Sequence, residues 1–222
     1  MAQSTSAAHT ASAPTQRLAQ ITLGLSAAFL ALLTLLHFLK PDFDPSWRMI
    51  SEYEIGRFGW MMRLAFFCWG GSVLALHLAL RVQVARGAGQ IGRWWLLVIA
   101  LFLFGAGIFA TLPIDDPTVT LVDNLHALCG VVVILTFPIA ATLTARGLAR
   151  GVWGGSRKAL SWATVLVWVG VVGYFGVYII ANQMNPYLPR VGPHVPQGWP
   201  NRLMVVFYHA WLWVVARPLS RA

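Results

Sequence analysis

The side chains best suited to chemistry are a few acids, histidines and basic residues that flank long apolar segments. Asp123 and His126 are three residues apart, so on a helix they share one face. A carboxylate in that place could orient the imidazole or raise its basicity, as carboxylates do for catalytic and metal-bound histidines. The alternative is structural, with Asp123 and Asn124 capping the start of a helix.

Arg202 and His209 form a second pair, seven residues apart and again on one helical face. The histidine would lie about 10 Å deeper than the arginine, because a helix rises about 1.5 Å per residue. A histidine at that depth needs a polar partner, and Asp123, Glu52 or a bound ligand could supply one. The alternative is a neutral imidazole bonded to a neighbouring carbonyl.

These two pairs belong to a larger candidate cluster of polar residues. Its charges could also be purely structural, with Arg63 paired to Glu52 and Arg202 paired to Asp115 or Asp116. If any residue binds a metal, His126 and His209 are the candidates. The full candidate cluster is Ser51, Glu52, Arg57, Arg63, Asp115, Asp116, Asp123, His126, Arg202 and His209.

The elements that must position this cluster are membrane-spanning helices. Of the 222 residues, 58% are hydrophobic and 10% are charged, whereas soluble domains carry about 25% charged residues. A spanning helix needs about 20 mostly apolar residues, and lipid-facing backbone must be helical. The fold class predicted is an all-α bundle of six transmembrane helices in one domain (17–222), after a disordered tail (1–16). The expected helices cover residues 21–39, 60–82, 94–112, 124–145, 159–181 and 202–216.

The charges divide between the two ends of this bundle. All seven acids lie in the segments that follow the first and third apolar blocks. A basic excess marks the cytoplasmic side, so both termini are predicted to be cytoplasmic and the acids to lie outside. The basic end carries Arg17, Arg81, Arg86, Arg93, Arg146, Arg150, Arg157, Lys158, Arg217 and Arg221.

The net charge of +9 does not indicate a nucleic-acid-binding protein. Its basic residues occupy short connections, where they act as topology signals and contact anionic headgroups. Membrane lipids are therefore the expected partners, nucleic acid is not, and no protein partner is indicated. Cys68 and Cys129 lie inside apolar blocks without CxxC spacing, so both are expected to be buried free thiols.

The segment 182–201 contains five prolines and therefore cannot form a regular helix. Long connections in a compact fold are often functional. We expect this segment to be an extended lid, held against the bundle by Tyr187 and Trp199. The two pairs described first should converge beneath it.

Several stretches of the sequence resemble a known family. Residues 50–54 (ISEYE) and 56–62 (GRFGWMM) resemble the domain-of-unknown-function 998 family of bacterial and archaeal polytopic membrane proteins. Further matching pieces are 107–117, 125–127 and 198–202, although 111–115 (TLPID) stands where the family usually reads Phe-Pro-x-Asp. The resemblance implies a six-helix domain of the bacterial cytoplasmic membrane without an established activity. A more distant likeness is to the Frag1/DRAM/Sfk1 group.

Three classes of function fit these observations, and the cofactor content is unknown. The first is an accessory or lipid-interacting bundle with a polar cluster at its extracytoplasmic face. The second is a metal-dependent hydrolase in the outer leaflet, using Ser51, Asp123, His126 and His209, although no HExxH pair is present. The third is a haem or quinone protein, although His37, His126 and His209 show no recurring haem spacing. Transport is disfavoured, because no internal repeat is detected.

Overall fold

The computed structural model describes residues 11–84, 87–148 and 150–221, and the regular elements in these ranges are helical. Six of the helices are long and apolar enough to cross a membrane, which confirms the expected multi-pass architecture. The long helices are α1 (Ala13–Leu39), α2 (Gly59–Ala79), α3 (Ala88–Ile108), α4 (Leu121–Gly147), α6 (Arg157–Met184) and α7 (Gly198–Arg221). The short elements are η1 (Ile50–Glu54), η2 (Leu80–Val82), α5 (Arg150–Trp153) and η3 (Gly154–Ser156).

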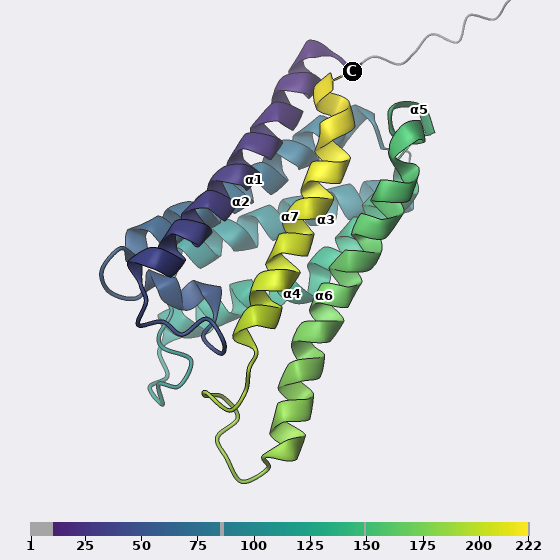
Figure 1. Cartoon of the computed structure of the whole chain (residues 1–222). Helices are drawn as coiled ribbons and strands as arrows, with labels where there is room; N and C mark the ends of the chain where they lie inside the picture. Colours follow the sequence, from purple (N-terminus) through teal and green to yellow (C-terminus); the bar gives the residue numbers. More distant parts are fainter. Residues whose placement is uncertain (1–10, 85–86, 149, 222) are drawn as a thin grey trace, which may run out of the picture.

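The long helices pack as a ring in which α7 closes the circle between α6 and α1. Each of the first four helices packs on the next along the chain, and α4 contacts α6 less extensively than it contacts α3. The start of α1, α5 and the end of α7 lie at one end, the terminal end (Figure 1). The connections 40–58, 109–120 and 185–197 lie at the opposite end, the loop end.

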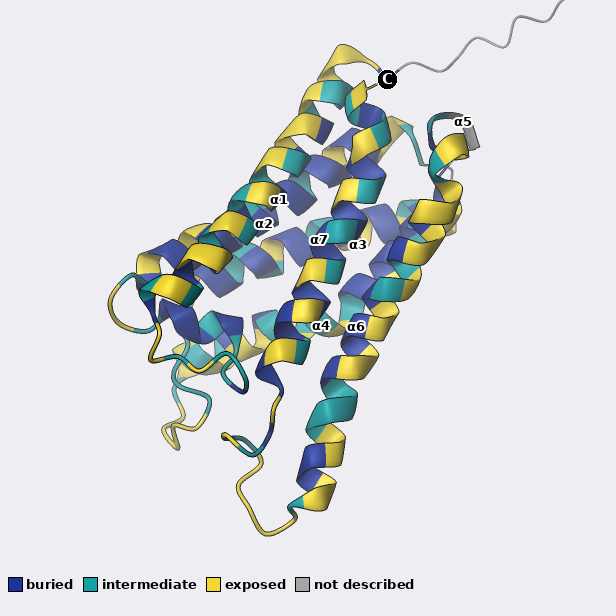
Figure 2. Ribbon diagram, in the orientation of Figure 1, coloured by how far each residue is buried: buried dark blue, intermediate teal, exposed yellow. Residues whose placement is uncertain are grey.

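Apolar side chains cover the outside of the bundle as well as its interior. Figure 2 shows buried and exposed stripes alternating along each long helix. On α6, Val167 is fully buried whereas Trp162 and Val172 are about two-thirds exposed. A helix that is apolar on all faces belongs in a membrane, where lipid covers the outer stripe. The chain is therefore a multi-pass membrane protein in a lipid environment.

All six long helices begin before the apolar blocks that predicted them, and α1 and α7 exceed their blocks by the most residues. Helix α1 begins at Ala13 rather than near residue 21, with Pro14 in its first turn, where a missing N–H costs nothing. Helix α7 runs from Gly198 to Arg221 rather than over 202–216. Hydrophobicity locates the membrane span, whereas turns of helix can continue outside it. Most of the expected tail, residues 1–10, lies outside the described residues.

Helices α3 and α4 meet through glycine at the terminal end. A Cβ added at Gly92 would collide with the backbone nitrogen of Thr144 and lie 2.9 Å from the Ala140 carbonyl oxygen. A Cβ at Gly89 would lie 2.5 Å from Gly147 Cα. Small residues allow the close backbone approach on which membrane helix packing depends. This crossing fixes α4, which forms one wall of the site described next.

We predict that Gly92→Ala lowers the stability of the bundle, because the new methyl group must push α3 away from α4. Overpacking of this kind costs about 1–3 kcal/mol, which is several degrees in melting temperature. The matched control is Gly24→Ala on the exposed face of α1, where an added Cβ meets nothing within 4 Å. Thermal unfolding in detergent checks the pair, and equal melting temperatures for the two variants would contradict the role of Gly92.

Candidate functional site

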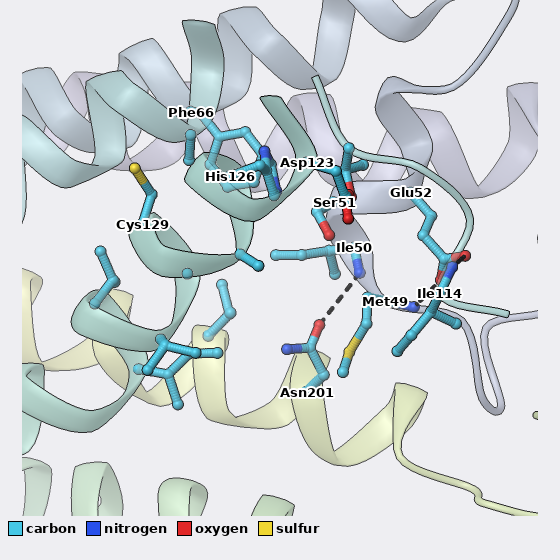
Figure 3. A pocket seen from close by; sticks show the side chains of 18 of the residues that line it. Met49, Ile50, Ser51, Glu52, Phe66, Ile114, Asp123, His126, Cys129 and Asn201 are labelled. Carbon is cyan, nitrogen blue, oxygen red and sulfur yellow. Dashed lines mark hydrogen bonds between the residues drawn. The ribbon is translucent and has the colours of Figure 1, made fainter. Parts of the chain in front are cut away.

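A cavity of about 330 Å³ lies inside the loop-end half of the bundle. Its walls come from η1, α2, α3, α4, α6, α7 and the connection 109–120 (Figure 3). The interior is apolar and is lined by Phe66, Trp69, Leu103, Val133, Ile134, Met204 and Val205. The mouth is polar and is lined by Ser51, Glu52, Thr111, Asp116 and Asp123, with His126 and Asn201 between mouth and interior.

The cavity reaches the lipid-facing side of α4. Val131 lines the cavity and is also 51% exposed on the outside of the helix. One turn earlier, Ala127 both lines the cavity and is exposed. Gly130 lies between them, and a Cβ added there would meet nothing within 4 Å. The cavity therefore borders an exposed stretch of α4 as well as the polar connections of the loop end.

Glu52 joins two of the connections that form the mouth. One carboxylate oxygen accepts from the Arg48 guanidinium at 2.6 Å and from the Ile114 backbone N–H at 3.0 Å. The other accepts from the Met49 N–H at 2.7 Å. Arg48 also pairs with Asp115 at 3.0 Å. The expected ion pairs, Glu52 with Arg63 and Arg202 with Asp115 or Asp116, are not formed within the described residues. Arg48 instead binds Glu52 and Asp115.

Asp123 fastens the connection 109–120 to the start of α4. One of its carboxylate oxygens accepts from the Leu112 N–H at 2.9 Å and from the Thr111 hydroxyl at 3.3 Å. The helix cap is Thr120, whose hydroxyl accepts from the Asp123 N–H at 3.1 Å. The capping interpretation thus fits Thr120 rather than Asp123 or Asn124.

His126 is buried in the cavity wall and held in one orientation. Its Nδ1 lies 2.8 Å from the Phe109 carbonyl oxygen, so that nitrogen donates and Nε2 carries the lone pair. Its ring meets the Phe66 ring edge to face, with centroids 5.9 Å apart. The expected partner Asp123 does not bond it. A different acid, Glu54, brings a carboxylate oxygen to 3.9 Å from Nδ1.

Glu54 is buried, and within the described residues neither of its carboxylate oxygens has a hydrogen-bond partner. Burial raises its pKa from 4.5 to about 8, although the nearby Arg63 opposes the rise. The turn that follows Glu54 brings Gly59 so close to the Glu54 carbonyl that any side chain at position 59 would collide with it. Phe58, which precedes that glycine, has a left-handed backbone conformation with φ of 67°.

Arg202 lies behind the mouth and organises it. Its guanidinium donates to His37 Nε2 at 2.7 Å, to the Arg48 carbonyl at 2.7 Å and to the Tyr53 hydroxyl at 3.1 Å. It also donates to the Gly198 carbonyl in its own helix at 3.0 Å. Within the described residues no carboxylate forms a salt bridge with it. The fixed positive charge is therefore compensated by carbonyl, phenol and imidazole dipoles.

His209 lies apart from the cavity, in the apolar core. It is fully buried and stacks on the Phe29 ring, with centroids 4.4 Å apart. Its Nδ1 is 2.7 Å from the Ser26 hydroxyl, which also accepts from the Trp213 indole N–H. The partner required at this depth is thus a serine of α1, a residue that the sequence did not single out.

The structure brings half of the candidate cluster together. Ser51, Glu52, Asp116, Asp123 and His126 line the cavity. Asp115 does not line the cavity, but it binds Arg48, which also binds Glu52 at the mouth. Arg57 and Arg63 are exposed, and Arg57 lies over the Phe58 ring. Arg202 and His209 belong to separate networks, so the expected convergence of the two pairs is not found.

The segment 182–201 does not cover the cavity as a lid would. Tyr187 is 98% exposed and therefore does not pack against the bundle. Of this segment, only Asn201 lines the cavity. Trp199 instead stacks near His37, with centroids 6.3 Å apart. The segment is fastened at Gly198, whose N–H donates to the Ser46 carbonyl at 2.9 Å. The mouth is formed by the connections 40–58 and 109–120.

Two buried polar residues at the site were missing from the predicted cluster: Asn201, which lines the cavity, and Glu54, which lies beside His126. Asn201 is 4% exposed, and its side-chain oxygen accepts from the Ile50 N–H at 3.2 Å (Figure 3). Glu54 supports His126 from behind. Glu54 belongs to the same ISEYE motif as Glu52, so the motif could have indicated it. Asn201 adjoins Arg202, so its sequence signal was that of a polar residue at the start of an apolar block.

Metal and haem chemistry find little support in these positions. Within the described residues no three His, Cys, Asp or Glu side chains are grouped so that they could hold a metal. His37, His126 and His209 lie in separate networks. Their Nδ1 atoms bond the Leu33 carbonyl, the Phe109 carbonyl and the Ser26 hydroxyl, and Nε2 of His37 accepts from Arg202. Cys129 is buried in the cavity wall and Cys68 is half-buried, both as free thiols.

We predict that Glu54 makes the protein less stable as the pH rises. Its folded-state pKa is about 8 and its ordinary value is 4.5, so the folded state binds the extra proton. Stability is then greatest below about pH 4.5 and falls as the pH rises through 8. Glu54→Gln should remove this slope and raise the melting temperature at pH 8 by at least about 2–4 °C, the effect of about 1 kcal/mol.

Thermal unfolding of wild type and Glu54→Gln in detergent at several pH values measures the difference. The exposed Asp44→Asn variant serves as a control that should keep the wild-type slope. Identical pH profiles for wild type and Glu54→Gln would show that Glu54 titrates normally.

Comparison with known proteins yields one family and no activity. No curated protein and no solved structure matched the chain. One family model, described as a protein of unknown function (DUF998), matches residues 22–218, which include all or most of each of the six long helices. The match includes the ISEYE stretch, of which Ile50, Ser51 and Glu52 line the cavity, and the GRFGWMM stretch that follows it. The chain belongs to the DUF998 family of proteins of unknown function.

Proposed function

We propose that this protein is a lipid-interacting protein of the bacterial cytoplasmic membrane, which holds the apolar chain of an amphipathic molecule in the cavity and its polar head at the mouth. The observation that carries this proposal is the shape of the cavity, with polar groups at the loop end and Phe66, Trp69 and Leu103 inside. Its volume of about 330 Å³ lies at the lower end of the usual range for small-ligand sites, about 300–1,000 Å³.

The exposed stretch of α4 that borders the cavity supports a ligand that comes from the bilayer. Because Val131 faces both lipid and cavity, an acyl chain can pass between the two without crossing water. An aqueous solute would instead have to enter past the Glu52 and Asp123 hydrogen bonds that fasten the mouth. Each methylene prefers an apolar environment to water by about 0.8 kcal/mol, so a long-chain amphipath resides in the bilayer and would reach the cavity from there.

The binding proposal accounts for the geometry better than a metal-dependent hydrolase does. Ser51, Asp123 and His126 do line one cavity, as a hydrolase would require. However, Asp123 binds the connection 109–120 rather than the imidazole, and His209 lies in the core. A nucleophile and its base must be within hydrogen-bond reach, and none of the hydrogen bonds of the described residues joins Ser51 to His126.

For the orientation, we propose that the terminal end is cytoplasmic and the loop end extracytoplasmic. The acids of the connections 40–58 and 109–120 lie at the loop end with the cavity mouth. Basic residues occupy the helix ends opposite, which is the arrangement expected of a cytoplasmic face. The described members are Arg17, Arg81, Arg93, Arg146, Arg157, Lys158, Arg217 and Arg221.

We predict that Gly130→Phe blocks the cavity and displaces its occupant. The Cβ of this variant has free space, so the ring can enter the cavity without disturbing α4. Co-purified lipid, measured by native mass spectrometry of the detergent-purified protein, should fall at least about tenfold relative to wild type, a difference of about 1.4 kcal/mol. Gly24→Phe, on the exposed face of α1, should retain the wild-type amount. Equal lipid retention in the two variants would contradict the proposal.

The orientation predicts a labelling pattern in intact cells. In a background with Cys68 and Cys129 replaced by serine, Tyr187→Cys at the loop end should react with a membrane-impermeant maleimide. Lys158→Cys, exposed at the terminal end, should react only after the cells are permeabilised. The reverse pattern would overturn the orientation.

A further inference from the structure

Most polar groups at the cavity mouth already have partners. Both carboxylate oxygens of Glu52 accept hydrogen bonds, and three different donors hold that side chain. The Tyr174 hydroxyl donates to the sulfur of Met49. The Thr111 hydroxyl donates to Asp123. A ligand therefore gains little from these groups, because each would have to exchange an existing bond.

Two acceptors in the wall have unused capacity. Because Nδ1 of His126 carries the proton that is donated to the Phe109 carbonyl, Nε2 has a free lone pair. His126 is 5% exposed. Both hydrogen bonds of the Asp123 side chain end on the same oxygen, Oδ1. Within the described residues the second oxygen of Asp123 and Nε2 of His126 make no hydrogen bond. Both residues line the cavity, so a ligand that donates hydrogen bonds could reach these acceptors without displacing an existing bond.

Asn201 contributes the remaining polar group. Its oxygen is used by the Ile50 N–H, which turns the amide nitrogen toward the cavity interior in Figure 3. That nitrogen has no hydrogen-bond partner within the described residues, although Asn201 is only 4% exposed. A small head group between Asn201 and His126 would satisfy both residues.

The charge of the mouth excludes an anion as the favoured head group. Among the described residues that line the cavity, none is Lys or Arg, whereas Glu52, Asp116 and Asp123 are acids. Hydrogen bonding by Thr118 lowers the pKa of Asp116, so this exposed carboxylate is ionised at neutral pH. Arg48 is bound by two acids, and the guanidinium of Arg202 is directed at carbonyls behind the mouth. A phosphate would meet repulsion and no cation among the described residues that line the cavity.

We infer that the occupant is an amphipath whose head group donates hydrogen bonds and carries no negative charge, a hydroxyl or an amine, bound by Asp123, His126 and Asn201. This inference rests on the proposed function, since it specifies the head of the molecule whose chain fills the cavity. The acceptors Asp123 Oδ2 and His126 Nε2 receive the donors of the head, and the Asn201 amide donates to its oxygen where it has one. The anionic phospholipids that surround the protein are thereby rejected from the cavity.

The test compares three probes with the same dodecyl chain and different heads: 1-O-dodecylglycerol, dodecylamine and dodecyl phosphate. Binding of each to the detergent-purified full-length protein is titrated by native mass spectrometry. We expect the glycerol and amine probes to bind at least about tenfold more tightly than the phosphate probe. Asp123→Asn keeps an oxygen for the Leu112 N–H but loses the charge, so it should weaken the amine probe about tenfold and strengthen the phosphate probe.

Asp44→Asn is the matched control, because it removes one exposed carboxylate at the same end, outside the cavity, and should leave all three affinities unchanged. Gly130→Phe separates the inference from the proposal beneath it. If all three probes bind equally and Gly130→Phe blocks all of them, the cavity binds chains without selecting heads and the inference fails alone. If no probe binds, or Gly130→Phe blocks none, the proposed function fails as well. Tightest binding by dodecyl phosphate would also overturn the inference.

Discussion

The architecture of the loop end depends on how one buried cation, Arg202, is satisfied. A guanidinium cannot give up its proton, so its donors must all find acceptors where water is excluded. Here the acceptors come from α1 through His37, from the connection 40–58 through Arg48 and Tyr53, and from α7 itself. The hydrogen bonds of Arg202 therefore fix the connection against two helices. Lys40, also buried, adds further bonds to the carbonyls of Tyr53 and Ile55.

Everything at the cavity mouth follows from that fixed connection. Once residues 40–58 are in place, Glu52 can bind the backbone of Ile114 and so position the connection 109–120. Asp123 then joins that connection to α4. The apolar interior beyond the mouth is set by helix packing, with the α3–α4 crossing at glycine holding α4 in position. A rigid polar rim is thus built on an apolar framework, with each of the two determined by separate interactions.

The fold was predictable from the sequence to a greater degree than the site. Long apolar blocks between polar connections require six helices, because lipid-facing backbone must bond internally. Pairings between connections carry no such periodic signal. Arg48 binds Glu52 and Asp115, although the sequence offered Arg63 and Arg202 as equally plausible partners. Helical spacing predicted that Asp123 and His126 share a face, and both line the cavity, whereas it could not show that His209 faces Ser26 of a helix distant in sequence.

The exposed stretch of α4 at Val131 has a consequence for how such a site would be filled. A binding site that exchanges with the bilayer responds to the mole fraction of its ligand among the lipids, and not to a concentration in water. Partitioning confines a sparse amphipath to a thin layer, so even a weak intrinsic affinity produces high occupancy there. Changes in membrane composition would then be registered directly by the cavity, without any soluble messenger.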